Sequence, residues 1–472
     1  MRVVMLSQNE WSHDSRVIRE SEALARLGYD VHVVCRAPVD APTTDERVDN
    51  VRYLSIPRKR PSRPSDVIGL FGGHMTVLLG DARRSFRGPH RARSLLSALQ
   101  LLGMIVVAPL AVLALAVTRL TPLGFVGRHG GRRLLDYLET IRYLNDYASA
   151  CGVAVVDLRP DIVHAHDLVT LSGGAIAARR AKARLVYDAH ELETHTNYHS
   201  HAPITTRWIA HYESILIQTC DAVVTVCDSI ADWLAHEYAI DRPVVVMNSP
   251  RLVTTLCPDG SLRAAVGLAG GLPLVVYVGS VTVDRGLELT VEALALLPGV
   301  HLATVGPRYV VTEAEMRRIA EENGVSDRLH FVDPVRSASV ASFIGDADAS
   351  VIPIQNVCLS YAFSFPNKLL ESVFAGVPVA AADLVEIRRF LTEHPVGLVM
   401  DETDPHAIAA TLRELIARRA EFAPDEAELK RIDAEYGWDV QEARLSALYT
   451  RLAGSTHAPT APARMSLSEL AS

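Results

Sequence analysis

Two successive series of apolar and amphipathic segments constrain the fold of this chain more than any other feature. In each series, a short apolar run of strand type is followed by a polar turn and then by a segment with helical periodicity. This order is typical of βαβ units, whose strands are parallel and buried. The predicted strands lie at residues 3–6, 31–34, 161–164, 184–187, 222–226 and 244–247 in the first series, and at 274–278, 301–305, 329–332, 349–353 and 377–380 in the second. The sequence therefore predicts an α/β fold with two doubly wound sheets.

The connection between the two series lies at residues 249–272, which mix Ser, Pro, Asp and Gly without periodicity. A chain of 472 residues is also too long for a single ordinary core. We expect a Rossmann-like N-terminal domain over 1–250, a second Rossmann-like domain over 270–435, a final helix over 437–454 and a disordered tail over 455–472. Because ligands of such sheets bind beyond the carboxyl ends of the strands, we expect the substrate site in a cleft between the domains.

Charge and cysteine content narrow the class of protein. A net charge of -8 argues against a general nucleic-acid binder, since such proteins carry a net basic footprint. The 6 cysteines form no Cys-x-x-Cys pair and show no ligand spacing for zinc, which favours a reducing cytoplasm. The apolar run at residues 3–6 is too short for the hydrophobic core of a secretory signal, so we interpret it as the first strand.

An apolar insert at about 83–133 interrupts the first series, and residues 95–117 within it carry no charge. A single membrane crossing here would leave the two halves of one sheet on opposite sides of the bilayer. Arginines flank both ends of the stretch, which suits two ends held at the same anionic leaflet. We therefore expect a helical insert in peripheral contact with the inner face of the cell membrane. A pair of buried core helices is the alternative.

The strongest chemical pattern lies at residues 361–380. Pro366 stands in the first turn of a predicted helix, with Ser364 as its expected N-cap, and the free N–H groups of such a helix can bind a phosphate. Lys368 adds a positive charge, and Glu371, one turn later, can accept hydrogen bonds from the vicinal hydroxyls of a ribose. The alternative is a surface ion pair between Lys368 and Glu371.

A glycine turn at the start of the second series supports the phosphate interpretation. Gly279 and Ser280 follow the predicted strand, and Arg285 precedes Gly286. A guanidinium here can bind a diphosphate through two parallel hydrogen bonds. Departure of a nucleoside diphosphate builds negative charge, which Arg285, Lys368 and a helix N-terminus can stabilise without a metal ion.

Histidines follow two neighbouring predicted strands of the first series. His164 and His166 alternate onto one face of a strand and Asp167 comes next, while His190 follows the adjacent strand. A histidine beyond the carboxyl end of a strand can bond a sugar hydroxyl or handle a proton. We therefore take His166, Asp167 and His190 as the candidate catalytic residues. A histidine that merely caps the following helix is the alternative.

We predict no metal site, because no Asp-x-Asp motif stands in a manganese-binding context. The one such string considered, Asp346-Ala-Asp348, joins a predicted helix to a predicted strand, and we interpret it as a solvated turn.

At these residues the chain resembles the family 4 glycosyltransferases, which have the GT-B fold and transfer sugars with retention at the anomeric carbon. The resemblance covers nearly the whole chain apart from the insert and the tail. The matching motifs are Asp14-x-Arg16, His164-Ala-His166-Asp167, Tyr187-Asp188-Ala-His190-Glu191, Arg285-Gly286, Pro366-Asn-Lys368-x-x-Glu371, Ala375-Gly376-Val-Pro378 and Tyr436-Gly437-Trp438.

The resemblance implies roles for several residues and a metal-independent enzyme without a cofactor, whose substrate is a nucleotide-diphosphate sugar. Glu371 is implied to hold the donor ribose, Arg285 and Lys368 the phosphates, and His166 the transferred sugar. The final helix is implied to pack back on the N-terminal domain. Together with the residues of the glycine turn and the helix start, the candidate donor-binding residues are Gly279, Ser280, Arg285, Asn367, Lys368 and Glu371.

Two positions depart from the family pattern. Phe363 stands where the Glu-x7-Glu motif has its first glutamate, a change that a related branch with a Pro-Asn-Lys loop shares. Ser280 follows Gly279 where the family usually has arginine, so this chain brings less charge to the diphosphate.

The predicted reaction is therefore transfer of a sugar to an acceptor, and the insert favours a lipid-linked or envelope glycan as that acceptor. A nucleotide-sugar epimerase on the same fold is one alternative, although it has no need of a membrane-seeking insert. A catalytically silent partner that anchors an assembly complex is the other, and Phe363 and Ser280 are its only support.

Overall fold

The computed structural model describes residues 1–39, 41–58, 154–197, 203–252, 261–268 and 270–454. The predicted membrane-associated insert at about 83–133 and the predicted tail at 455–472 lie outside these residues. Among the helices of the described ranges, none combines the length and the hydropathy that crossing a bilayer requires.

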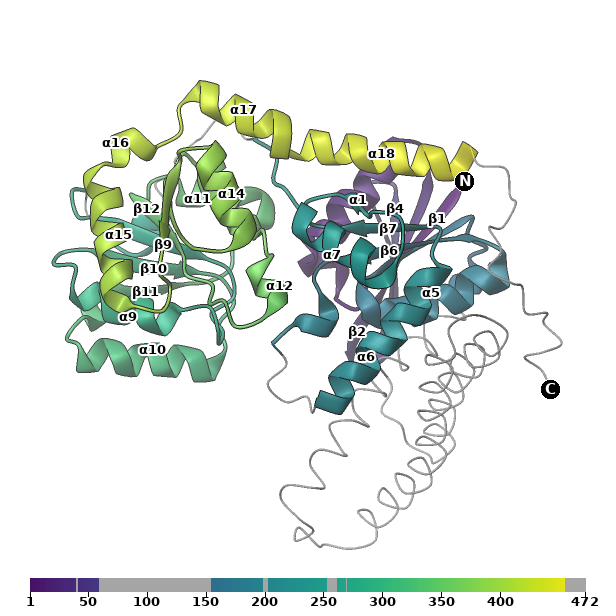
Figure 1. The fold of residues 1–472 in the computed structure, drawn as a ribbon, viewed down its shortest axis with the longest axis horizontal. Coiled ribbons are helices and arrows are strands. Elements are labelled where there is room, and N and C mark those ends of the chain that lie inside the picture. The colour runs from purple at the N-terminus through teal and green to yellow at the C-terminus, as the bar shows by residue number, and fades with distance from the viewer. Residues whose placement is uncertain (40, 59–153, 198–202, 253–260, 269, 455–472) are drawn as a thin grey trace, which may run out of the picture.

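Two α/β domains lie side by side, as the two series of segments predict (Figure 1). The described residues form an 8-stranded sheet in the first domain and a 6-stranded sheet in the second. Strand pairing within these sheets is parallel, except between β3 (Thr44–Val48) and β4 (Val51–Arg58), which form an antiparallel hairpin at one edge. The predicted class of two doubly wound, Rossmann-like domains is therefore confirmed.

The first sheet has the strand order β3-β4-β2-β1-β5-β6-β7-β8. Its remaining strands are β1 (Arg2–Leu6), β2 (Asp30–Val39), β5 (Ile162–His166), β6 (Arg184–Ala189), β7 (Ala222–Thr225) and β8 (Val244–Val245). The helical segments of this domain are η1 (Trp11–His13), α1 (Ser15–Arg26), α5 (Asp167–Ala181), η2 (Glu193–His195), α6 (Pro203–Leu216), η3 (Ile217–Thr219) and α7 (Asp228–Tyr238).

The second sheet has the order β11-β10-β9-β12-β13-β14. Its strands are β9 (Leu274–Val278), β10 (His301–Val305), β11 (Leu329–Val332), β12 (Ala349–Ile352), β13 (Val379–Ala382) and β14 (Gly397–Met400). Its helical segments are α8 (Ser261–Ala265), α9 (Leu287–Ala295), α10 (Val310–Glu322), η4 (Ser326–Arg328), η5 (Ser337–Ser339), α11 (Val340–Ile344), α12 (Leu359–Ala362), α13 (Asn367–Phe374), α14 (Val385–Glu393), α15 (Pro405–Ala417), α16 (Arg419–Phe422) and α17 (Glu426–Tyr436).

Helix α8 corrects the expectation of an irregular connection at 249–272. It spans only 5 residues, too few to show helical periodicity in the sequence. Leu262 within it is buried in the core of the second domain. The second domain therefore begins before the predicted boundary at residue 270.

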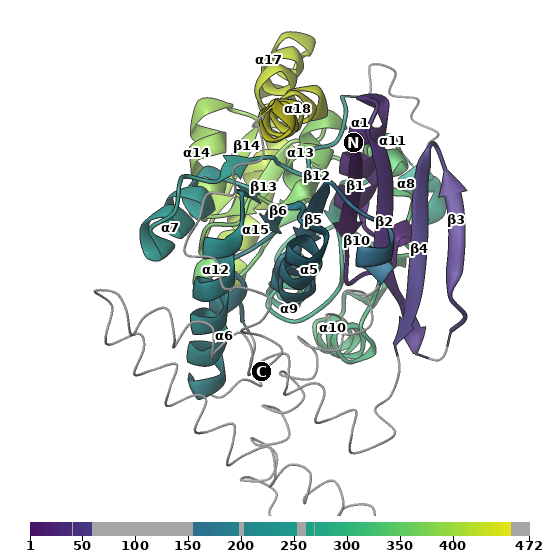
Figure 2. The ribbon, with the colours of Figure 1, turned by 90° about the vertical axis from the view of Figure 1, so that its right-hand side faces the viewer.

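The last helix, α18 (Trp438–Gly454), returns to the first domain. It runs on from α17 along the top of Figure 1, and Figure 2 shows it on the same side of the first sheet as α1, opposite α5 and α6. Trp438, Leu445 and Tyr449 are buried there against β1. The Tyr449 hydroxyl also lies 2.7 Å from Nδ1 of His164. The C-terminal helix thus closes one face of the first sheet.

Close packing of α5 on the other face brings the ends of β5 and β6 together at the cleft. Every residue of both strands is buried. A side chain at Gly174 of α5 would place its Cβ 3.1 Å from that of Ala165, which is tighter than ordinary van der Waals contact. The glycine therefore lets α5 lie directly against the strand that leads to His166 and Asp167.

Candidate active site

A cavity of about 300 Å³ lies between the two domains. The first domain contributes Arg16, His190 and Asn248 to its wall, and the second contributes Phe365, Asn367 and Leu370. Of the predicted site residues, His190 and Asn367 line this cavity.

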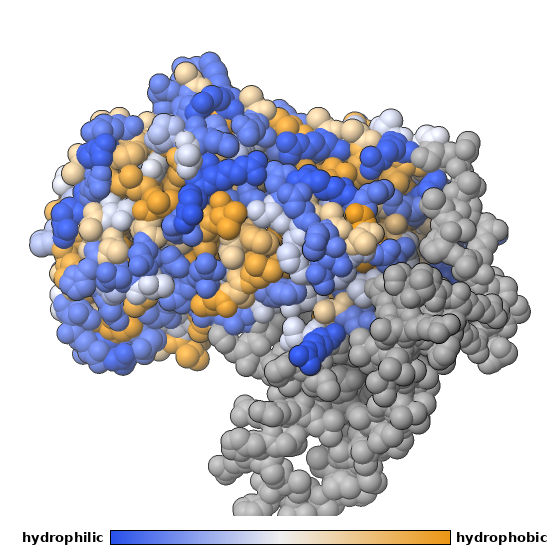
Figure 3. Space-filling view, in the orientation of Figure 1, coloured by the Kyte–Doolittle hydropathy of each residue, from blue (hydrophilic) through white to orange (hydrophobic). Residues whose placement is uncertain are grey.

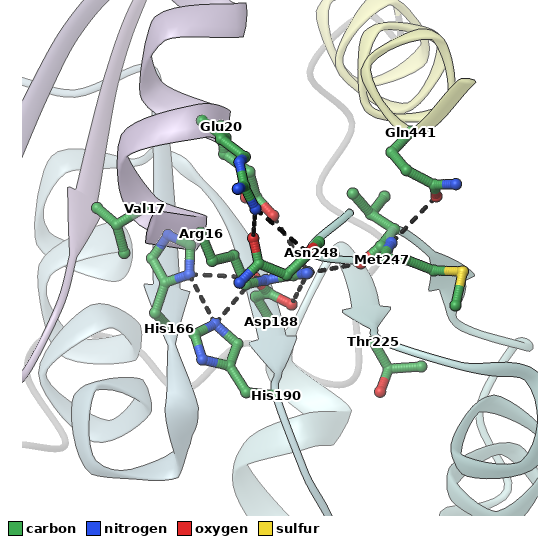
Figure 4. A network of polar contacts seen from close by, with 12 residues as sticks. Arg16, Val17, Glu20, His166, Asp188, His190, Thr225, Met247, Asn248 and Gln441 are labelled. Carbon is green, nitrogen blue, oxygen red and sulfur yellow. Dashed lines mark hydrogen bonds and ion pairs between the residues drawn. The ribbon is translucent and has the colours of Figure 1, made fainter. Parts of the chain in front are cut away.

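Arg16 of α1 joins the first loop of the chain to the end of β6 (Figure 4). Its Nε and Nη2 each donate to one oxygen of Asp188 over 2.7 Å, and its Nη1 donates to the Val246 carbonyl over 2.6 Å. Glu20 lies 3.1 Å from Nη2. Burial by itself lowers the pKa of Arg16, but Asp188 and Glu20 raise it above its ordinary value. A buried ion pair thus joins the Asp14-x-Arg16 motif to the distant motif that contains Asp188.

Two histidines meet at the same carboxylate (Figure 4). Nδ1 of His166 lies 3.1 Å, and Nε2 of His190 lies 3.2 Å, from Oδ2 of Asp188. Nδ1 of His190 lies 3.3 Å from Oδ2 of Asp167. Burial lowers the pKa of both imidazoles. For His190, Asp167 and Asp188 outweigh burial and raise the pKa to about 10. For His166, burial and His164 lower the pKa to about 3. At neutral pH His190 is a cation and His166 is neutral.

The two histidines differ in access to the cleft. His166 is 1% exposed, while the side chain of His190 is 20% exposed and lines the cavity. The structure therefore places His166 beneath the substrate-facing surface, although the resemblance implies contact with the transferred sugar. The reason is local, because α5 begins directly at Asp167 and leaves His166 within the buried strand. The His166 side chain forms no capping bond to α5 either.

In the second domain, Lys368 lies across the glycine turn after β9. Its Nζ is 2.9 Å from the Tyr277 hydroxyl and 4.0 Å from the centre of that ring. The Tyr277 hydroxyl in turn donates to the Ser280 carbonyl over 2.9 Å. Gly279 has φ +122°, and a Cβ there would lie 2.9 Å from Nζ of Lys368. Gly279 and Ser280 therefore shape the position of the lysine, which forms no ion pair with Glu371 in the described structure.

Arg285 stands beside Lys368 at the mouth of the same turn. Its guanidinium lies 5.0 Å from the centre of the Tyr361 ring, and it makes no hydrogen bond or salt bridge to other described residues. Burial and Arg285 hold the pKa of Lys368 well below its ordinary value. A side chain at Gly286 would meet the Pro353 carbonyl at 2.1 Å, so only glycine fits after this arginine.

The N-terminus of α13 corrects the expected cap. The helix begins at Asn367 with Pro366 as its N-cap residue, and no side chain caps it. Ser364 lies too far upstream, and its buried hydroxyl has no partner among the described residues. The first N–H groups of α13 are therefore free of a side-chain cap.

Glu371 lies one turn into α13 and faces the first domain. Its exposed fraction is 9%, and burial raises its pKa, against the opposing effects of Arg19 and Lys368. Arg19 of α1 donates to the Asn248 side chain over 2.5 Å and to the Ser337 hydroxyl of the second domain over 3.2 Å. Sequence reasoning missed Arg19, whose only signal is its place one turn after Arg16.

Phe363, at the position of the missing glutamate, forms an apolar contact between the domains. Phe363 and Phe365 pack against the core of the first domain, and Cys227 of that domain bonds the Phe363 carbonyl over 3.1 Å. Hydrophobic surface is also visible where the two domains meet in Figure 3. Phe363 therefore replaces the carboxylate of the family pattern with an apolar contact between the two domains.

Two groups of residues with potential metal ligands lie in the described structure. Ligand atoms of Glu20, His164, His166 and Asp188 lie within 4.8 Å of one another, a spacing that could hold an ion. The Arg16 guanidinium already contacts both of these carboxylates, so a cation here would meet a positive charge.

The second group corrects the expectation of a solvated turn. Asp348 pairs with Arg263 over 2.6 Å and with Arg419 over 2.7 Å, and its side chain is only 17% exposed. Asp346 accepts from the Arg263 backbone N–H over 3.1 Å. This string thus anchors α8 and α16 to the start of β12.

Both domains match models of known families. Residues 105–249 match the model described as Glycosyltransferase Family 4, and residues 272–418 match Glycosyl transferases group 1. Together the two segments make up more than half of the 472 residues. The chain belongs to the family 4 glycosyltransferases.

Curated relatives and solved structures agree with this assignment. The D-inositol 3-phosphate glycosyltransferase of Xylanimonas cellulosilytica is 28% identical over 309 residues, which cover 62% of this chain and 72% of that one. The enzyme of the same name from Corynebacterium glutamicum is 26% identical over 310 residues, with 61% and 72% covered.

Among solved structures, sucrose-phosphate synthase from Thermosynechococcus elongatus has a TM-score of 0.64 at 16% identity, with 97% of this glycosyltransferase and 100% of that chain covered. Anabaena HepE in complex with UDP-glucose has a TM-score of 0.61 at 12% identity, with 96% and 100% covered. These likenesses confirm the predicted GT-B fold of the family 4 glycosyltransferase described here.

Proposed function

We propose that this glycosyltransferase takes its sugar from a nucleoside-diphosphate donor, without a metal ion and with retention at the anomeric carbon. The observation that carries the proposal is the gathering of Arg285, Lys368 and the uncapped N-terminus of α13 at one side of the interdomain cleft. All three attract phosphate. The solved structure of HepE with UDP-glucose, whose fold this chain shares, adds support.

Positive charge at the cleft would stabilise the leaving diphosphate. The Arg285 guanidinium has five N–H donors and no competing salt bridge among the described residues. The depressed pKa of Lys368 reflects burial and the neighbouring arginine, and a diphosphate between them raises it again. A bound diphosphate thus favours the protonated form of Lys368, which neutralises charge as the bond to the sugar breaks.

Glu371 is the proposed contact to the donor ribose. Its carboxyl group lies one turn beyond the phosphate-binding end of α13, which suits a ribose attached to that phosphate. Burial keeps bulk water from competing for the carboxylate.

The proposed acceptor is a lipid-linked or envelope glycan, reached from the cytoplasmic side of the cell membrane. Its support is the uncharged stretch at 95–117 with arginines on both flanks. Sedimentation of membranes tests this part. The protein should remain on salt-washed membranes, and a double variant with Val106→Lys and Leu110→Lys should move to the supernatant. Equal partition of both proteins would contradict membrane insertion.

The reaction itself is tested with a panel of labelled nucleotide sugars and a membrane extract. Label in the lipid fraction supports transfer, and the anomeric configuration of the product, measured by NMR, tests retention. Isomerised donor without transfer would favour the epimerase, and neither product would favour a silent partner. D-inositol 3-phosphate belongs in the same assay as a soluble acceptor, because the curated relatives carry that name. Transfer to soluble acceptors alone would contradict the lipid-linked acceptor.

A further inference from the structure

Asp167 occupies a sharp elbow between β5 and α5. It is the first residue of the helix, it follows the last residue of the strand directly, and its φ is +62°. A left-handed conformation is unfavourable for a residue with a Cβ atom. Such strain persists only where the surroundings enforce it, and it clusters at functional sites.

Neighbouring contacts enforce this elbow. The Thr170 hydroxyl lies 2.6 Å from the His166 carbonyl and 3.2 Å from the Asp167 carbonyl, which holds the first turn of α5. The close approach of Gly174 to Ala165 keeps α5 directly against β5. The backbone conformation of Asp167 is therefore built into the packing of the first domain.

The elbow places the Asp167 carboxylate against His190, a residue of the cavity wall. Its side chain is 13% exposed, and its Oδ2 lies 3.3 Å from Nδ1 of His190, which lines the cavity. The His190 backbone N–H also bonds this carboxylate. Asp188 holds the other ring nitrogen of His190 at 3.2 Å. A fixed imidazolium thus orients a carboxylate whose remaining lone pairs can accept further hydrogen bonds.

Charge around the elbow selects the chemistry of its ligand. Burial and Asp167 raise the pKa of Glu191 to about 7, so two carboxyl groups stand together on this side of the cleft. Carboxylates repel a phosphate but accept hydrogen bonds from neutral hydroxyl groups, and Arg285, the proposed phosphate ligand, is the cation of the second domain that acts on Glu191. The charged or titratable groups that face His190 are Asp14, Arg16, Glu20, His166, Asp167, Asp188 and Glu191.

We infer that the Asp167 carboxylate accepts a hydrogen bond from the reacting hydroxyl of the acceptor and orients that hydroxyl toward the donor sugar. The inference rests on the proposed glycosyl transfer and adds the acceptor contact to it. His190 is a positioning residue, because it holds the carboxylate rather than the acceptor. The acceptor presents a neutral polyol surface here, with its anionic groups elsewhere.

Two variants separate this role from a structural one. Asp167→Asn keeps the size of the side chain but removes its charge. Asparagine also tolerates the left-handed region, so the backbone conformation is preserved. Asp167→Gly removes both the side chain and the backbone strain. Asp49, an exposed aspartate with φ +47° in the turn between β3 and β4, provides the matched controls Asp49→Asn and Asp49→Gly.

The assay measures transfer to the membrane extract, the slow hydrolysis of the same labelled nucleotide sugar by water, and binding of the nucleoside diphosphate. Asp167→Asn should lower transfer by roughly 100-fold, because an unoriented hydroxyl loses its alignment. Hydrolysis and nucleoside-diphosphate affinity should stay within about twofold of the wild type, since they do not use the acceptor. Asp167→Gly should lose transfer equally, and its melting temperature measures the balance between the relieved backbone strain and the lost ion pair with His190. The Asp49 variants should keep full transfer.

Undiminished transfer by Asp167→Asn would overturn the inference. So would an equal loss of transfer, hydrolysis and nucleotide binding, which would mark a role in folding or in donor binding. A wild-type protein that neither transfers nor hydrolyses any nucleotide sugar in the panel would overturn the proposed function, and the inference with it.

Discussion

The guanidinium of Arg16 and the carboxylate of Asp188, which are 172 residues apart in the chain, form a buried bidentate ion pair at the base of the cleft. Asp188 lies on β6 beside the strand that carries His166, and it contacts both His166 and His190. One carboxylate therefore links α1 to the polar residues of two strand ends. The geometry of the first domain at the cleft depends on this pair.

Removal of one partner of this pair should destabilise the protein strongly. Asp188→Asn removes the bidentate carboxylate from the buried Arg16 charge and leaves it only Glu20, and breaking a buried pair in this way typically costs about 3–5 kcal/mol. Urea denaturation measures the free energy of unfolding. The control is Asp45→Asn, which breaks the exposed pair with Arg52 and should cost less than about 1 kcal/mol. Similar values for the two variants would contradict the importance of the buried pair.

Loss of the Glu371 carboxylate should weaken donor binding without unfolding the second domain. Glu371→Gln keeps the shape of the side chain but replaces charged hydrogen bonds to the ribose, so affinity for the nucleoside diphosphate should fall roughly 10- to 100-fold. Isothermal titration calorimetry provides the measurement. Glu393→Gln, at the exposed end of α14, is the control and should bind as the wild type does. Unchanged affinity in Glu371→Gln would remove the ribose assignment.

A methyl group at Gly279 should disturb both the backbone and Lys368. Gly279→Ala forces an alanine into φ +122° and places its Cβ 2.9 Å from Nζ of Lys368. We expect a loss of about 1 kcal/mol or more in stability and weaker binding of the nucleoside diphosphate. Gly270→Ala is a suitable control, because a Cβ there meets no atom within 4 Å and the glycine has no left-handed φ. Normal nucleotide binding by Gly279→Ala would show that the lysine position is not critical.

The two coupled histidines should make stability depend on pH in opposite directions. The folded-state pKa of His190, about 10, lies above the ordinary value of 6.5, so its contribution is fully present below pH 6.5 and is lost as the pH rises toward 10. The folded-state pKa of His166, about 3, lies below 6.5, so stability falls as the pH drops from 6.5 toward 3, because only the unfolded chain takes up that proton.

Urea denaturation at pH 5, 6.5 and 8.5 tests both signs. In His190→Asn the free energy of unfolding should fall less between pH 6.5 and 8.5 than it does in the wild type. In His166→Asn it should fall less between pH 6.5 and 5. If the free energy of unfolding of both variants changes with pH as it does in the wild type, the assigned charge states are wrong.

Local periodicity was enough for most of the fold. The predicted strands at 274–278, 301–305 and 329–332 coincide with β9, β10 and β11, because a buried parallel strand is a continuous apolar run bounded by turn residues. The helix that begins near Pro366 was visible through that proline in its first turn. Helix α8 was not, because 5 residues make little more than one helical turn and so show no repeat of the apolar pattern.

The sequence predicted several residues of the candidate site but not their contacts, and of the predicted residues His190 and Asn367 line the cavity. The second-domain group needed only short-range geometry, since Lys368 and Glu371 are one turn apart and the glycine turn precedes Arg285. The alternative of a surface ion pair with Glu371 is absent from the described residues, and Lys368 is instead buried against Tyr277, a contact that no spacing rule reveals. From the sequence, Phe363 indicated only the absence of a carboxylate. Its packing on the core of the first domain is a tertiary contact that the sequence pattern does not contain.

Residue types, spacing and periodicity predicted two doubly wound domains, a helix that begins beside Pro366 and histidines at neighbouring strand ends, because each depends on residues within a few positions of one another. Long-range packing assigned the charges and the exposures. Asp188 is shared by Arg16, His166 and His190, and this sharing makes one histidine a buried neutral group and the other a cation at the cavity wall. Such an assignment needs burial and charge summed over three dimensions, and neighbours along the chain do not contain it.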